Sequence, residues 1–204
     1  ADLPETVLLD RVGTLGADER VALIRAYVGE RSNRRHKPGR AFERVDYRFD
    51  VLSYYGAFRD LQRHRMLTIE WQRLTPDHGY VRPELVDAAG VGPLFDDTME
   101  RSARLHDDLA GAGFHEQAGY AVSMAYRIRY AMQFNAREAI HMLELRSAPQ
   151  GHPSYRRIAL EMFRLIGEQA GHHAVADAMR HMTMEAPALE RLASERRAES
   201  RRRG

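Results

Sequence analysis

The sequence contains no cysteine, and this absence removes several classes of protein from consideration. Without thiols there is no disulfide framework, no cysteine-ligated zinc site and no thiolate nucleophile, which excludes enzymes that work through a cysteine adduct. No apolar run approaches the ~20 residues that a membrane-spanning helix needs. Residues 1–10 also lack the basic start and apolar centre of a signal peptide. We therefore expect a cytoplasmic protein.

Lysine is almost absent, since Lys37 is the single lysine among 31 basic residues. The formal net charge is +2, but the last ten residues hold five arginines against two glutamates. The basic excess therefore belongs to this terminal segment and not to a folded face. Charge runs of this kind are solvated or disordered. We expect a folded domain over residues 1–193 and a disordered Arg-rich tail over 194–204, with no nucleic-acid partner.

Two segments alternate apolar and polar side chains with a period of two, the pattern of a half-buried strand. They are Val45–Val51 and Tyr126–Phe134. Shorter strands are expected over Met66–Trp71, which is rich in β-formers, and over the apolar run Val7–Leu9. The chain of 204 residues, 44% of them hydrophobic, is long enough to bury a core around such strands.

Helical patterns of very different length separate these strands. Helices are expected from Asp18, after Gly56, over Leu94–Leu109, over Ala136–Arg146 and over His152–Met182 with a kink at Gly171. Asn135 is a good N-cap for the fourth of them. The segment Thr75–Pro93 is rich in turn residues. Because no regular βαβ rhythm is present, the fold class is α+β (mixed α/β), with a central sheet of long strands flanked by helices.

Several common catalytic and binding motifs are missing. No GxGxxG or GxxxxGK[ST] sequence occurs, so neither a Rossmann nor a P-loop phosphate site is indicated. No GxSxG elbow provides a serine nucleophile. The ten histidines include no HExxH pair, so no metal site is expected.

Arg63, His64 and Arg65 place three cationic or titratable side chains in a row. Consecutive side chains point in different directions, and arginine forks bind phosphate or diphosphate groups bidentately. An exposed charged turn would explain the same three residues without any ligand. The spacing alone leaves both interpretations open.

Asn135 and Arg146 lie eleven positions apart, about three helical turns, and so near one face of the expected helix. An N-cap and a cation at the C-terminal end of a helix are both common structural features. A binding role is the second interpretation.

These two motifs, in this order, resemble the flavin-dependent thymidylate synthase family. That family carries an RHR-x7-S motif shortly after a long strand, matched here by Arg63–Arg65. It also carries a later strand that leads into Asn-x-Arg and a helix that ends Leu-Arg, matched by Asn135–Arg137 and Leu145–Arg146. The distances between these landmarks agree without large gaps, and the resemblance runs from Val7 to Met182.

The resemblance implies a homotetramer of mixed α/β subunits that binds FAD where chains meet. In the family, NADPH reduces FAD, methylenetetrahydrofolate donates a methylene, and dUMP is methylated to dTMP without a cysteine nucleophile. The positions that correspond to flavin-binding residues are Arg63, His64, Arg65, Asn135 and His141. Arg146 corresponds to an arginine of the pyrimidine-nucleotide site. The resemblance leaves the catalytic residue unknown.

The sequence departs from the family pattern at several positions. The replacements are Arg73 for the motif serine, Trp71 for an acid, Thr75 for an arginine, Asp60 for a glutamine, Gly119 for a phosphate-binding arginine and His141 for a flavin-side asparagine. Each lost charge-assisted hydrogen bond is worth roughly 1.5–3 kcal/mol. We therefore expect dUMP to bind weakly or not at all. Arg73 would supply a different anion contact if the substrate is an altered uridine nucleotide.

Three hypotheses remain open. The first is an active FAD enzyme of the thymidylate synthase type with an altered uridine nucleotide as substrate. The second is a non-catalytic flavin-binding or assembly domain that completes the sites of a related tandem domain. The start at Ala1 without methionine is expected for an excised second domain and equally for ordinary removal of methionine. The third is an unrelated α+β binding protein with a fortuitous RHR sequence.

Overall fold

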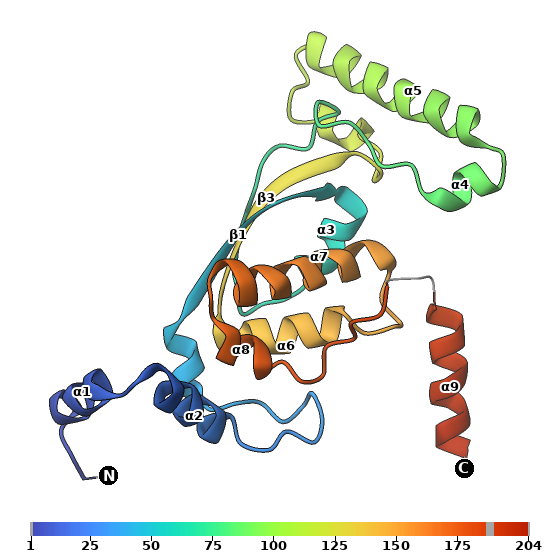
Figure 1. Ribbon diagram of the computed structural model, residues 1–204. Coiled ribbons are helices and arrows are strands. Elements are labelled where there is room, and N and C mark those ends of the chain that lie inside the picture. Colours follow the sequence, from blue (N-terminus) through green and yellow to red (C-terminus); the bar gives the residue numbers. More distant parts are fainter. Residues whose placement is uncertain (1, 187–189, 204) are drawn as a thin grey trace. The chain divides into compact units, whose positions relative to one another are not determined.

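The computed structural model describes residues 2–186 and 190–203, and the chain forms two compact units (Figure 1). The first unit consists of Ala1–Tyr47 and Asn135–Gly204, and the second is Arg48–Phe134. The chain passes between the units within two long strands, β1 (Asp46–Tyr54) and β3 (Arg127–Asn135). Helices and a small antiparallel sheet together confirm the expected mixed α/β class.

The sheet has three strands in the order β1-β3-β2, with β2 at Thr68–Trp71. β2 runs antiparallel to β3, in a register from Thr68↔Gln133 to Trp71↔Tyr130. Along β3 the even-numbered side chains are buried and the odd-numbered ones are not, as the period of two predicts. All three strands expected between residues 45 and 134 are thereby confirmed to within a few residues.

Tyr130 is a fully buried residue of the second unit. Its ring and that of Phe58, on α3 (Tyr55–Leu61), pack in a T-shaped arrangement with a centroid distance of 4.8 Å. Its hydroxyl lies 3.1 Å from the Ser53 hydroxyl. Burial raises the pKa of the Tyr130 phenol to about 12, so the neutral form persists well above physiological pH. The strand β3 and the helix α3 are thus held together by a buried, hydrogen-bonded aromatic contact.

A second cluster in this unit holds α5 (Gly92–Gly111) against the short helix η2 (Ala118–Ala121). Met99, Val122 and Tyr126 are its buried members, and the Tyr126 hydroxyl donates a hydrogen bond to the Met99 carbonyl at 2.7 Å. The helix expected over Leu94–Leu109 is confirmed as α5. The five-residue α4 (Glu84–Ala88) lies in the stretch expected to hold only turns, and it is too short for a periodic pattern to reveal.

The first unit is helical. Its elements are α1 (Glu5–Thr14), α2 (Ala17–Val28), η1 (Arg40–Arg44), α6 (Ala136–Arg146), α7 (Pro153–Arg164), the π-helical turn η3 (Leu165–Gln169), α8 (His173–Asp177) and α9 (Arg191–Arg203). Its centre is α6, with seven buried residues, which packs on α7. Over residues 2–186 and 190–203, no helix has both the length and the apolarity needed to cross a bilayer. The helices expected from Asp18 and over Ala136–Arg146 are confirmed.

Two expectations for this unit are wrong. The expected strand Val7–Leu9 is part of helix α1, because a three-residue apolar run does not distinguish strand from helix. The single long helix expected over His152–Met182 is divided. It passes into the π-helical turn after Arg164 and ends before Gly171, whose φ of +69° is left-handed and incompatible with continuing the helix.

The Arg-rich segment, for which a disordered tail over 194–204 is expected, includes the helix α9 (Arg191–Arg203). Charged side chains one turn apart stabilise this helix. Arg191 contacts Glu195 at 2.8 Å, and both side chains are more than half exposed. Such pairs at positions i and i+4 contribute about 0.2–0.5 kcal/mol each. The local charge pattern therefore favours a helix.

A buried ion pair joins three segments of the first unit. Arg31, after α2, makes two parallel hydrogen bonds of 2.7 Å to the Glu144 carboxylate on α6. The two side chains are 2% and 0% exposed. Arg31 also donates to the Ala178 carbonyl at 2.6 Å, and the His181 backbone N–H donates to Glu144 at 3.2 Å. The network therefore ties the loop after α2 and the segment after α8 to the central helix.

Candidate functional site

The loop Arg63–Arg65 follows directly on the C-terminus of α3. Gln62 caps that helix, and the His64 backbone N–H donates to the Leu61 carbonyl at 3.3 Å. Arg63 and Arg65 are exposed and His64 is half-buried. Cations are favoured at this end of a helix because the last carbonyl groups carry partial negative charge. Both arginine side chains are therefore accessible to solvent.

Arg63 has an ion-pair partner on the preceding helix, α3. Its guanidinium lies 2.7 Å from the Asp60 carboxylate and donates to the Arg59 carbonyl at 3.2 Å. The Arg63 side chain is 69% exposed, and an ion pair this exposed is worth only about 0–1 kcal/mol. A phosphate group that offers bidentate hydrogen bonds can compete for the same guanidinium. The donor set thus fits the diphosphate of a dinucleotide cofactor.

The last residue of β2, Trp71, and Arg73 in the segment that follows are two of the departures from the family pattern. Trp71 is 58% exposed, and its ring lies 5.8 Å from that of Phe58. The Arg73 guanidinium lies 3.8 Å from the Glu116 carboxylate, and both side chains are more than half exposed. Gly119 lies in η2 beside Tyr120, which is 92% exposed. Arg73 is therefore an accessible cation where the family has a serine.

Asn135 is the N-cap of α6. Its side-chain oxygen accepts a hydrogen bond from the Glu138 backbone N–H at 2.9 Å. This contact confirms the expected cap, and it uses only the carbonyl half of the side-chain amide. The NH₂ group of the same amide retains two donors, which suit the carbonyl and nitrogen acceptors of a flavin ring.

The cap and a ligand contact can be separated by substitution at Asn135. Asn135→Ala should lower the free energy of unfolding by about 1 kcal/mol, because it removes the cap. Asn135→Asp keeps the capping oxygen but removes the NH₂ donors, so it should leave stability within about 0.5 kcal/mol of the wild type. Urea unfolding checks both values. If Asn135→Asp also retains flavin as well as the wild type does, Asn135 is a cap alone.

His141 and Arg146 complete the set of expected site residues on α6. His141 is half-buried. Arg146, in the last turn, lies over the ring of Tyr155 at 5.4 Å and is also half-buried. The structure therefore brings Asn135, His141 and Arg146 onto one helix of the first unit. Arg63–Arg65 and Arg73 belong to two adjacent segments of the second unit.

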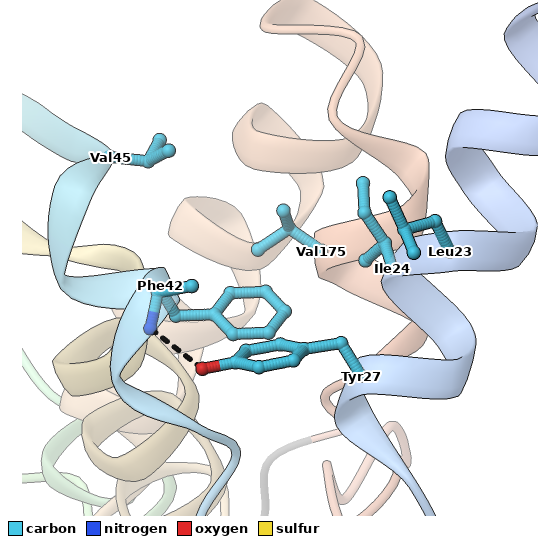
Figure 2. A pocket seen from close by; sticks show the side chains of 7 residues that line it. Leu23, Ile24, Tyr27, Phe42, Val45 and Val175 are labelled. Carbon is cyan, nitrogen blue, oxygen red and sulfur yellow. Dashed lines mark hydrogen bonds between the residues drawn. The ribbon is translucent and has the colours of Figure 1, made fainter. Parts of the chain in front are cut away.

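An apolar groove in the first unit was not expected from the sequence (Figure 2). Its volume is about 360 Å³. The lining side chains come from α2, from η1 and the residue that follows it, and from α8. They are Leu23, Ile24, Tyr27, Ala41, Phe42, Val45 and Val175. The Tyr27 and Phe42 rings stack at 6.0 Å, and the Ala41 backbone N–H donates to the Tyr27 hydroxyl at 2.9 Å. No local sequence signal marks the groove, because its walls lie up to about 150 residues apart.

Comparison with known proteins gives one family and several relatives. The family described as thymidylate synthase complementing protein matches residues 16–170. A UPF0159 protein of Chlamydia pneumoniae is 42% identical over 162 residues, which are 79% of this chain and 30% of the relative. A UPF0159 protein of Thermoplasma acidophilum is 38% identical over 163 residues, 78% of this chain and 32% of the relative. The chain thus spans about a third of the length of the curated relatives it matches.

Proposed function

Because the chain belongs to the thymidylate synthase complementing protein family, we propose that it is an FAD-dependent protein of the thymidylate synthase type. The reaction is the reductive methylation of a uridine nucleotide with methylenetetrahydrofolate and NADPH, in a substrate pocket altered from the family pattern. The observation that carries the proposal is the exposed Arg63–Arg65 loop at the end of α3, inside the matched range.

The chain's own residues would bind and orient the cofactor and the nucleotide. Arg63 and Arg65 supply guanidinium forks for the FAD diphosphate, and the Asn135 amide supplies donors to the ring. Arg146 and Arg73 are the cations proposed for the nucleotide phosphate. When bound, the flavin supplies the hydride and one-carbon transfer chemistry, while the protein supplies position and charge. We further propose a homo-oligomer, a tetramer by resemblance, that works in the cytoplasm.

The first experiment is the visible absorption spectrum of the purified protein across a size-exclusion peak, before and after addition of FAD. We expect a flavin spectrum that co-elutes with the protein at tetramer size. A folded protein that stays colourless after FAD is added would contradict the proposal. A flavin spectrum that co-elutes with a protein smaller than a tetramer would support the cofactor and contradict only the tetramer.

The altered pocket should bind dUMP weakly, with a dissociation constant well above the micromolar range. The physical reason is the replacement of an acid and a serine by Trp71 and Arg73, which removes hydrogen bonds worth roughly 1.5–3 kcal/mol each. Titration calorimetry on the FAD-loaded protein measures the affinity. The double variant Trp71→Glu/Arg73→Ser restores the family residues and should bind at least tenfold more tightly. Micromolar binding of dUMP by the wild type would show that the lost residues are not needed.

A second candidate is a non-catalytic flavin-binding or assembly domain that completes the sites of a partner domain. The altered pocket, in which Trp71 and Arg73 replace an acid and a serine of the family pattern, favours it. The two candidates differ in one measurement. Oxidation of NADPH that depends on both a uridine nucleotide and methylenetetrahydrofolate supports the enzyme. Flavin binding without such oxidation, for any uridine nucleotide tested, supports the assembly domain.

A further inference from the structure

The loop between α2 and η1, in the first unit, contains a tight turn with two arginines at its tip. The His36 backbone N–H donates to the Asn33 carbonyl at 3.1 Å, which closes the turn. The Asn33 side-chain oxygen accepts a hydrogen bond from the Arg35 backbone N–H at 2.9 Å, a contact by which asparagine stabilises turns. Arg34 and Arg35 therefore occupy the two central positions of a hydrogen-bonded turn.

Both sides of this turn are fixed to the rest of the first unit. On one side, the buried Arg31 guanidinium binds Glu144 and also donates from Nε to the His36 carbonyl. On the other side, the Pro38 carbonyl accepts a hydrogen bond from Arg137 Nε at 3.0 Å. A loop that is held in one conformation before a ligand arrives loses less conformational entropy on binding.

The cations at the tip have no counterion within the described part of the chain. No carboxylate there forms an ion pair with Arg34, Arg35 or Lys37, whereas Arg40 and Arg44 each pair with a glutamate. Arg35 and Lys37 are exposed, and Arg34 is half-buried. Like charges that are crowded on a fixed turn repel each other, so an external anion would relieve this repulsion as well as bind the guanidinium forks.

The surroundings of the turn indicate which kind of anion fits. Residues 32–37 are all polar or charged, and all except Arg34 are exposed. A projecting surface of this kind does not suit a small molecule, which binds in a concave pocket. It also lacks the apolar side chains that form the centre of a protein interface or enter a membrane. A nucleic-acid backbone needs neither a pocket nor an apolar contact, because its phosphates bind arginine and lysine on open surfaces.

We propose that this turn binds the phosphate backbone of a nucleic-acid strand, with Arg34, Arg35 and Lys37 each contacting a phosphate. Phosphate contacts carry no direct sequence information, and residues 32–37 offer no tyrosine, phenylalanine or tryptophan ring on which a base could stack. Binding is therefore independent of base sequence. The charge count did not reveal this surface, because acids elsewhere offset these cations in the sum but not in space.

Fluorescence anisotropy of a labelled single-stranded DNA, measured over a series of salt concentrations, tests the proposal. Each phosphate contact on a single strand adds about 0.7 to the slope of log K against log salt. The triple variant Arg34→Gln/Arg35→Gln/Lys37→Gln should therefore lower the slope by about two and weaken binding at low salt roughly tenfold or more. A strand of unrelated sequence should bind the wild type with the same affinity. Urea unfolding confirms that the variant is folded.

A charge-matched variant of the C-terminal helix is the control. Arg191→Gln/Arg196→Gln/Arg197→Gln removes the same charge from exposed positions on α9 and should leave the slope unchanged. Wild-type binding by the turn variant, or an equal loss in the tail variant, would overturn the proposal.

Two further outcomes count against the proposal. The first is a wild type that does not bind the DNA at low salt. The second is competition by polyglutamate at equal charge concentration, which would assign the turn to an acidic polypeptide. The assay needs no flavin, so a protein that binds DNA but not FAD, or FAD but not DNA, separates this inference from the proposed function.

Discussion

Replacing Glu144 by alanine should destabilise the first unit by about 3–5 kcal/mol, because it leaves the Arg31 guanidinium buried without its carboxylate. The Arg31 side chain is 2% exposed, so solvent cannot take the place of the lost partner without local unfolding. A typical domain has only about 5–15 kcal/mol of stability. A large fall in the urea midpoint is therefore expected, with little change in the slope of the transition.

Companion variants distinguish the free-energy cost of an unpaired buried charge from the contribution of the intact ion pair to stability. Arg31→Met alone should cost a similar amount, because the Glu144 carboxylate then lacks its two 2.7 Å hydrogen bonds. The double variant Arg31→Met/Glu144→Leu leaves no buried charge and should be more stable than either single variant. A double variant as unstable as the sum of the singles would mean that the two residues act independently, contrary to the geometry.

Substitution of Arg63 by alanine should abolish the retention of flavin through gel filtration. Arg63 is the cation that follows α3, and a bidentate arginine–phosphate contact contributes two charge-assisted hydrogen bonds. At roughly 1.5–3 kcal/mol each, their loss weakens FAD binding about a hundredfold or more. Arg63→Lys retains the charge but not the fork, so it should recover only part of the affinity. Fluorescence titration of FAD measures all three affinities.

Two controls make this result specific. Arg101→Ala removes an arginine of similar exposure, paired with Asp97 at 2.9 Å on α5, and should leave flavin binding unchanged. Asp60→Asn frees Arg63 from its 2.7 Å ion pair and should tighten FAD binding. Full retention of flavin by Arg63→Ala would show that this residue does not bind the cofactor, whatever the resemblance implies. The stability of Arg63→Ala should stay within about 1 kcal/mol of the wild type, since the broken pair is exposed.

Local patterns along the chain were sufficient to predict several elements of secondary structure. The alternation over residues 126–134 predicted β3, and the cap at Asn135 predicted where α6 begins. The spacing of Arg63–Arg65 and Asn135–Arg137 was enough for the resemblance to the family that the comparisons then showed. These signals need only side chains within one or two turns of each other, and the chain carries them whether or not it is folded.

Features that join residues far apart in the chain are visible only in the folded structure. The Arg31–Glu144 pair joins positions 113 residues apart, and no local pattern distinguishes these two residues from the many exposed arginines and glutamates. The groove is likewise lined by side chains from segments that lie far apart in the chain. The conformation of Val7–Leu9 and the end of α7 were also predicted wrongly from local patterns. Whether a side chain is buried, and which residue it pairs with, depends on the folded chain. The free energy of a charge or an apolar group is set by the groups that surround it in space and not by its neighbours in sequence.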